Sequence, residues 1–372
     1  MIALESAIRE RLLPAILGRE ATDNLRLTYS LPARLGGLGI QIPTEEADFE
    51  FQNSILMTGQ LTEAIYQQQS SLTIDVDEQS KTAADLSLRK SDKHKATTEL
   101  LKSRISEAEF RMLELASEKG ASLWLTSLPL AVYGFRLNKQ QFADAICLRY
   151  NLPLHDVPRK CMCGVDYSIE HCLTCKNGGY VHLRHNAVRD SAHELLQAVC
   201  KDVRLEPSLL PVTGEALPAS ANRDDGARAD ISAVGLWIPL SRAFFDVKVV
   251  KPLARNNWNM KLNTMYRHHE SLKNNAYRDR ILQVDKGSFT PLVFSCTGGA
   301  APEATKFIKQ LALKLSLRKM ERYSETVSYL RRRFSFEILR TCVISLRGER
   351  GKPKHQEDIM ELDIELCAAA IE

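Results

Sequence analysis

The sequence contains no apolar run long enough to cross a bilayer, which takes about 20 consecutive apolar residues in a helix. It also lacks a secretory pattern at its start, because Glu5, Arg9 and Glu10 interrupt the apolar residues there. The segment 36–39 is rich in glycine but lacks the Lys-Ser/Thr pair of a phosphate-binding loop, so it is better interpreted as a turn. We therefore expect neither a membrane partner nor a nucleotide site.

Cysteine is present in an odd number, nine, and several of the nine are clustered. This usage suits metal binding in a reducing compartment better than a disulfide scaffold. The spacing Cys161-x-Cys163-x7-His171-x3-Cys175 suits a structural, tetrahedral Zn²⁺ site with two ligands from a tight knuckle. Cys172 leaves an alternative open, in which four cysteines bind the metal and His171 is free.

A second group of polar residues lies in an apolar stretch at 244–250. Side chains alternate faces in a strand, so Asp246 and Lys248 point the same way, while Phe245, Val247 and Val249 point the other way and are expected to be buried. Two charges in such a strand are costly to bury without partners. A half-exposed strand with a surface salt bridge is the alternative interpretation.

Asp230 precedes this strand by an interval that suits a β-hairpin. Two carboxylates, Asp230 and Asp246, could hold Mg²⁺, and Lys248 could orient or activate water for phosphodiester hydrolysis. This arrangement resembles that of the PD-(D/E)xK restriction-like nucleases. Glu194, on the helix predicted before the hairpin, is either an outer metal ligand or simply an exposed acid.

The hydrophobic periodicity around these residues predicts a mixed α+β or α/β fold, a sheet flanked by helices. In chain order we expect a helix at 187–199, a strand at 203–207, the two strands with the carboxylates, a helix from about 259 to 284, a strand at 290–295 and a helix at 302–317.

Short motifs occur in a fixed order along the chain. They are C-x-C-G, H-x-L-x-C, G-G, R-H-N-x-x-R-D, E-P-x-L, A-R-x-D-I-x-A-x-G-x-W, F-F-D-V, Y-R-x-H-E and G-S-F-T-P-L-V-F-S. This order resembles the C-terminal part of non-LTR retrotransposon polyproteins that carry a restriction-like endonuclease. Segments 31–40 and 124–130 also resemble the region after the polymerase in those proteins, so the resemblance covers about residues 5–348.

The resemblance implies a CCHC zinc knuckle, which favours His171 over Cys172. It further implies a nuclease that nicks chromosomal target DNA to prime reverse transcription, acts in the nucleus and has element RNA as a further partner. Two features depart from the family. Ala229 stands where the nuclease motif has proline, and no Y-x-D-D polymerase motif is present, so we expect no reverse transcriptase activity. The alternative is a non-cleaving, zinc-dependent nucleic-acid-binding module from a degenerate element.

The length suggests two or three domains. We expect a helical, thumb-like segment at 1–75, a polar linker and long helix at 76–120, a helical segment at 121–157, the zinc knuckle at 158–180, the restriction-like endonuclease at 181–345 and a disordered tail at 346–372.

Basic side chains near the predicted nuclease could contact phosphates through a salt-sensitive electrostatic term. The residues predicted to bind nucleic acid are Arg184, His185, Arg189, Arg267 and Lys273. For Arg184 and Arg189 the alternative is pairing with Asp190 and Glu194 of the same helix.

Overall fold

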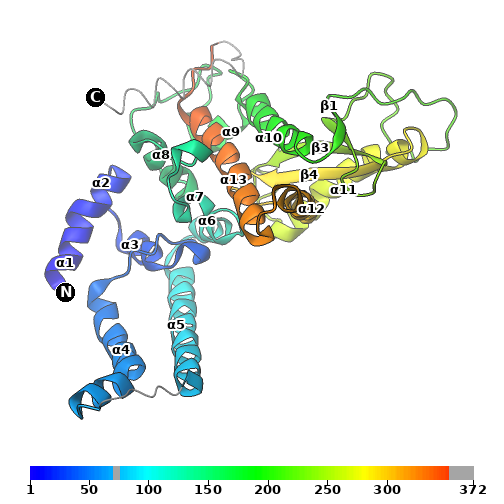
Figure 1. Ribbon diagram of the computed structural model, residues 1–372. Helices are drawn as coiled ribbons and strands as arrows, with labels where there is room; N and C mark the ends of the chain where they lie inside the picture. Colours follow the sequence, from blue (N-terminus) through cyan, green and yellow to red (C-terminus); the bar gives the residue numbers. More distant parts are fainter. Residues whose placement is uncertain (70–75, 352–372) are drawn as a thin grey trace. The chain divides into compact units, whose positions relative to one another are not determined.

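The computed structural model describes residues 1–69 and 76–351, and the chain divides into two compact units, Met1–Ser117 and Glu118 onwards. The first unit is helical and the second mixes helices with a sheet, so the fold is α+β (Figure 1). Within the described ranges, no helix combines the length and apolar character needed to cross a membrane.

The first unit is built from helices, two of which are long. Its elements are α1 (Ile2–Ala7), a π-helical turn (Ile8–Leu12), α2 (Leu13–Leu17), α3 (Asp23–Ser30), a 3-10 turn (Ala33–Leu35), α4 (Pro43–Tyr66), α5 (Val76–Arg104) and α6 (Glu107–Ser117). Leu31, Leu101 and Leu113 form a buried cluster that joins α5 and α6 to the residues after α3. The helix α5 already begins at Val76, so the polar segment expected to be a linker is itself helical.

The second unit contains the remaining helices and all the strands of the described chain. Its elements are α7 (Leu123–Thr126), a 3-10 turn (Ala131–Tyr133), α8 (Lys139–Tyr150), α9 (Ile169–Thr174), α10 (Tyr180–Gln197), β1 (Lys201–Leu205), β2 (Ile231–Val234), β3 (Arg242–Val250), α11 (Leu262–Gln283), β4 (Ser288–Ser295), α12 (Pro302–Lys319) and α13 (Tyr323–Arg347). The order of helices and strands predicted for 187–317 is therefore confirmed, with ends that differ by a few residues, although α10 begins earlier than expected, at Tyr180.

The strands form one mixed sheet in the order β1-β2-β3-β4. β1 pairs antiparallel with β2, β2 pairs antiparallel with β3, and β4 runs parallel to β3. The hairpin expected between the two carboxylates is thus present. Parallel strands need a long crossover, and α11 supplies it between β3 and β4.

The two faces of β3 are covered by different helices. Phe244 packs against Ile281 of α11, and Val250 packs against Met265 and Tyr266 of the same helix. On the other face, the Phe245 ring meets Phe307 of α12 with centroids 5.2 Å apart. Because side chains alternate along a strand, Asp246 and Lys248 lie on the face that α11 covers.

The C-terminal helix α13 packs on the α12 side of the sheet, where the Phe334 ring stacks on Phe294 of β4. The expectation of a disordered tail from residue 346 is wrong for its first residues. Leu346 is fully buried, and the Arg350 side chain is 4% exposed. Residues 352–372 lie outside the described chain.

Candidate functional site

The residues of the predicted zinc site come from a tight turn and a short helix. A bridge between Lys160 and Asp166 and a hydrogen bond from the Gly164 N–H to the Cys161 carbonyl close the turn. Gly164 has φ +86°, a conformation that favours glycine. The helix α9 comes directly after the turn, with Ser168 as its N-cap.

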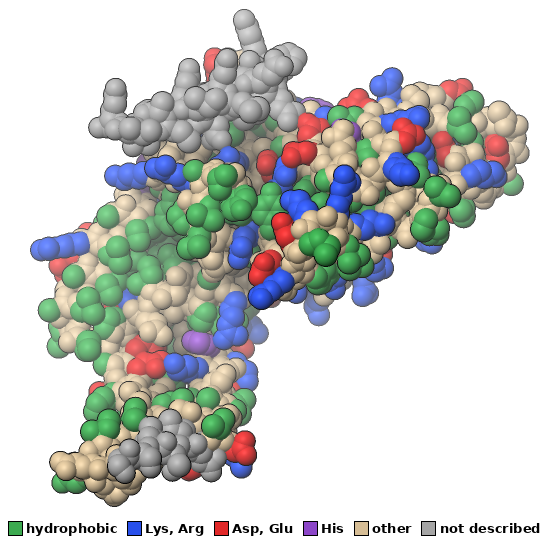
Figure 2. Space-filling view, viewed as in Figure 1, with side chains coloured by type: hydrophobic (Ala, Val, Ile, Leu, Met, Phe, Trp, Pro, Cys, Tyr) green, Lys and Arg blue, Asp and Glu red, His purple; other side chains and the backbone are tan. Residues whose placement is uncertain are grey.

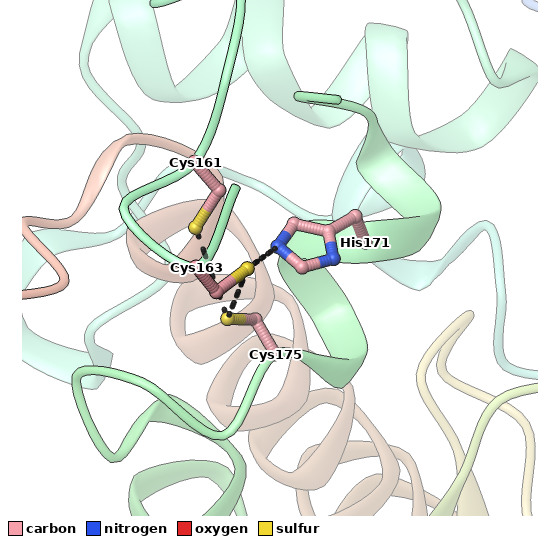
Figure 3. Close-up of side chains that lie close together, drawn as sticks. All are labelled: Cys161, Cys163, His171 and Cys175. Carbon is pink, nitrogen blue, oxygen red and sulfur yellow. Dashed lines mark hydrogen bonds between the residues drawn. The ribbon is translucent and has the colours of Figure 1, made fainter. Parts of the chain in front are cut away.

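The four predicted ligand atoms converge, all lying within 4.8 Å of one another (Figure 3). Cys161 Sγ lies 3.8 Å from Cys175 Sγ, and Cys163 Sγ lies 4.0 Å from it. A zinc ion with bonds of about 2.3 Å to sulfur would separate tetrahedral thiolates by about 3.8 Å. The His171 Nε2 atom completes the group, 3.2 Å from Cys163 Sγ.

The electrostatics differ between the thiols of this group, because burial and the neighbouring Cys161 and Cys163 raise the pKa of Cys175. Burial opposes ionisation of Cys161, but hydrogen bonds from the Cys163 backbone and from neighbouring side chains lower its pKa to about 6. A thiolate is the form that binds metal. Within residues 1–69 and 76–351, this is the only group of three or more His, Cys, Asp or Glu side chains placed to hold a metal ion such as zinc.

Cys172 does not belong to this group. Its side chain is 1% exposed, burial raises the pKa of its thiol, and it lies beside Tyr167 and Arg350. A helix turns 100° per residue, so consecutive residues His171 and Cys172 present different faces. The structure therefore resolves the alternative in favour of His171.

This assignment predicts opposite results for two neighbouring variants. His171→Ala should lose most of the zinc that the purified chain carries, because it removes a ligand atom. Cys172→Ser should keep about one zinc per chain. Elemental analysis of the two proteins decides between them, and the reverse pattern would establish the all-cysteine site.

The carboxylates Asp230 and Asp246 meet at one end of the β2–β3 ladder. Ile231 pairs with Phe245, and the two acids immediately flank this pair on the two strands. The Val247 N–H donates to Asp230 Oδ2 at 2.6 Å, which fixes this carboxylate beside the Asp246–Val247 peptide. Burial is the main reason why the pKa of Asp246 is raised. The nearby Asp230 carboxylate raises it further.

Two lysines lie beside Asp246, one on the same strand and one on α11. The Lys273 Nζ atom forms an ion pair with Asp246 Oδ2 at 2.6 Å. Burial disfavours charge on Lys273, but the Asp246 carboxylate outweighs it and raises the pKa of Lys273. Burial and the Lys273 charge instead lower the pKa of Lys248. Lys273, predicted as a phosphate contact, is thus part of the carboxylate group.

Two histidines adjoin this group in positions that the sequence pattern did not predict. The His185 Nε2 atom is 3.1 Å from Asp230 Oδ1, so a residue predicted to bind nucleic acid instead contacts a carboxylate. Burial, Lys248 and His268 lower the pKa of His269 to about 4, and its Nε2 atom is 3.2 Å from Asn257 Oδ1. The i, i+4 spacing of His269 and Lys273 on a helix is the signal that could have placed them on one face.

Glu194 is placed differently from the predicted outer ligand. It forms an ion pair with Arg333 of α13, at the surface. Glu194 is nine positions after His185. At about 100° per residue this is about two and a half helical turns, so Glu194 lies on the other side of α10. The structure therefore supports the alternative of a surface acid.

The two arginines predicted to contact phosphates at the start of α10 already have protein partners. Arg189 forms ion pairs with Asp190 and Glu206. The pair with Asp190 is the one that the alternative interpretation predicted. Arg184 is 4% exposed, and its Nη2 donates to the Leu173 carbonyl at 2.9 Å. The prediction that Arg184 binds DNA is therefore wrong, because its guanidinium is buried and donates a hydrogen bond to the backbone of α9. Arg267 is exposed on α11 and stays a prediction.

Figure 2 shows Lys and Arg side chains over the sheet-bearing part of the molecule, with acidic side chains between them. Residues 331–333 are three consecutive arginines of α13, and two phenylalanines, Phe334 and Phe336, follow them closely. Both phenylalanine rings are buried. Phe334 stacks on Phe294, and Phe336 stacks on Phe135 with centroids 4.7 Å apart. These rings are part of the core, so they are not free to stack on bases.

No protein-family model matches the chain, and neither does any curated protein.

Proposed function

We propose that the chain is the metal-dependent DNA endonuclease part of a retrotransposon protein. The single observation that carries the proposal is the meeting of Asp230 and Asp246 beside Lys248 and Lys273. Two carboxylates can hold a divalent cation and a nearby lysine can orient water, which suits phosphodiester hydrolysis. Nicking of target DNA would leave a 3′-hydroxyl that can prime reverse transcription, and action on chromosomal DNA would occur in the nucleus.

The order of elements supports this assignment. A helix, three antiparallel strands, a crossover helix, a parallel strand and a further helix are the arrangement expected of a restriction-like core. The two acids lie at the start of one strand and within the next, as the D…(D/E)xK pattern requires. The Cys161, Cys163, His171 and Cys175 group precedes this core, and Zn²⁺ bound there would have a structural role, because protein ligands would fill all four positions.

The donor set of the carboxylate site fits Mg²⁺, which prefers oxygen ligands. Asp230 and Asp246 would hold the ion, which supplies charge neutralisation at the scissile phosphate when bound. Asp246 is buried and its pKa is raised, so a cation beside it relieves an unfavourable carboxylate charge. The Lys273 ammonium already stabilises the Asp246 carboxylate charge through its ion pair with Oδ2.

The two lysines are suited to different steps. Lys248 lies on the same face of β3 as Asp246, where its side chain would orient the attacking water, and burial and the Lys273 charge lower its pKa. Lys273 has a raised pKa and stays an ammonium, which stabilises negative charge on the phosphate and on Asp246. His185 keeps Asp230 in place through its contact with Oδ1.

This division predicts different kinetic effects for two methionine variants, a lower rate in one and a shifted pH profile in the other. Lys248→Met should lower the single-turnover nicking rate by about 10²-fold, because the group that orients the attacking water is lost. Lys273→Met should shift the acidic limb of the profile to higher pH, because removing the ammonium raises the pKa of Asp246 further. Identical pH profiles for the parent chain and Lys273→Met would show that Lys273 does not affect the carboxylates needed for nicking.

A nicking assay on supercoiled DNA tests the proposed function. With Mg²⁺ the chain should convert supercoiled circles to open circles whose nick a polymerase can extend, which shows a 3′-hydroxyl. Binding to DNA without cleavage would identify the chain as a non-cleaving nucleic-acid-binding module instead. Element RNA can be compared with DNA in the same binding series.

A further inference from the structure

Three buried cations from three different elements converge on the short helix α9. Lys251 Nζ donates to the Glu170 carbonyl at 2.9 Å, Arg184 Nη2 donates to the Leu173 carbonyl at 2.9 Å, and Arg350 Nη2 donates to the Cys172 carbonyl at 3.3 Å. Arg184 and Arg350 are 4% exposed and Lys251 is 7% exposed. A buried charge is tolerated only with good partners, so these contacts fix α9 relative to the elements that carry the cations.

Two of these cations, Arg184 and Lys251, lie on or directly after elements that form the carboxylate site. Arg184 lies next to His185 on α10, and its hydrogen bond sets the rotation of the first turns of that helix. Lys251 comes directly after β3, three residues beyond Lys248. It also pairs with the Glu170 carboxylate at 3.2 Å, so both the backbone and a side chain of α9 hold the end of β3.

The predicted metal ligands lie within α9, at its C-terminal end and on the turn before it. His171 lies on the helix and Cys175 is its C-cap, while Cys161 and Cys163 lie on the preceding turn. A helix of six residues does not persist in water by itself, because nucleation is unfavourable. A metal ion at these ligands would therefore add to the contacts that keep α9 formed and its carbonyls in place for the cations.

We propose that α9 is a positioning element that couples metal occupancy of the Cys161, Cys163, His171 and Cys175 site to the geometry of the carboxylate site. Arg184 and Lys251 are the positioning residues: Arg184 places His185 against Asp230, and Lys251 places the end of β3. Arg350 has the same role toward the end of α13. It lies between the Tyr167 and Tyr180 rings, 5.4 and 5.3 Å from their centroids. This inference rests on the proposed function for its effect on cleavage, but not for its effect on structure.

The test measures hydrogen exchange and nicking in the full chain. Arg184→Met and Lys251→Met keep the apolar stem and remove the hydrogen bond. Arg333→Met is the matched control, because Arg333 also contacts α10 but pairs with Glu194 at the surface. Each protein is assayed for zinc by elemental analysis, for exchange of the Val247 amide and for single-turnover nicking. The parent chain stripped of zinc by a chelator is measured in parallel.

We expect both positioning variants to keep about one zinc per chain, because every ligand is intact. Exchange of the Val247 amide, which bonds to Asp230 Oδ2, should rise about tenfold in them and in the zinc-stripped parent, with exchange in α12 unchanged. Nicking should fall about 10- to 100-fold in the variants, the range typical of residues that orient ligands. Arg184→Lys and Lys251→Arg should recover part of the loss, and Arg333→Met should match the parent.

Unchanged Val247 exchange after zinc removal and in both variants would overturn the coupling. So would a purified parent chain that contains no zinc. A parent chain that does not nick DNA but shows the exchange changes would keep the coupling and reject the proposed function. A variant that exchanges rapidly throughout, α12 included, is unfolded, and the zinc-stripped parent then decides.

Discussion

Asp246→Asn should abolish Mg²⁺-dependent nicking while leaving DNA binding nearly unchanged. The substitution keeps the size of the side chain but removes the charge that would hold the metal ion beside Asp230 and Lys273. Metal-assisted stabilisation is worth several kcal/mol, so we expect the single-turnover rate to fall by about 10³-fold or more. Binding should persist, because the residue is 6% exposed and does not present its charge to a phosphate.

A matched control for this variant is Asp202→Asn. Asp202 is also an acid of the sheet, but it is exposed on β1 and pairs with Arg204 and Arg242. It should nick DNA at the parent rate. A nicking rate for Asp246→Asn within about threefold of the control would reject the proposed metal site, since a true ligand costs far more than that.

Cys161→Ser should remove the bound zinc and destabilise the second unit. Structural zinc contributes on the order of 10 kcal/mol to small zinc domains, and part of that would be lost with one thiolate. We expect the thermal midpoint of the purified protein to fall by on the order of 10 °C. Proteolysis should then cut within 158–180, where the turn and α9 depend on the metal.

Cys200→Ser is the control for the loss of a thiol. Cys200 is a half-buried free cysteine after α10 and does not belong to the metal group. Its variant should keep zinc and the parent midpoint. Equal midpoints for Cys161→Ser and the parent, measured by calorimetry, would show that the metal site does not hold this region together.

The elements around the site could be predicted from the sequence because their periodicity is local. The alternation in 244–250 predicted β3, and the spacing of apolar residues predicted α10 and α11. The Cys161, Cys163, His171 and Cys175 group could be predicted equally well, since its members lie within 161–175 and their spacing already restricts the geometry. The order of strands and helices then came from the pattern along the chain.

The contacts that complete the carboxylate site could not be predicted in this way. The His185–Asp230 and Lys273–Asp246 contacts depend on how α10 and α11 lie on the sheet, which no local spacing determines. The prediction that Arg184 contacts phosphates is wrong because it assumed that a charged side chain would be exposed. Arg184 lies four residues before the buried Val188, so the helical period already places it on the apolar face.

The most direct test of the central claim is a Mg²⁺ titration of strand cleavage by the parent chain on supercoiled DNA, with Asp246→Asn beside it. The proposed function predicts open circles that accumulate with a saturable dependence on Mg²⁺, disappear with a chelator and are absent from the variant. Cleavage that is independent of Mg²⁺, equal cleavage by both proteins, or DNA binding without any cleavage would contradict it.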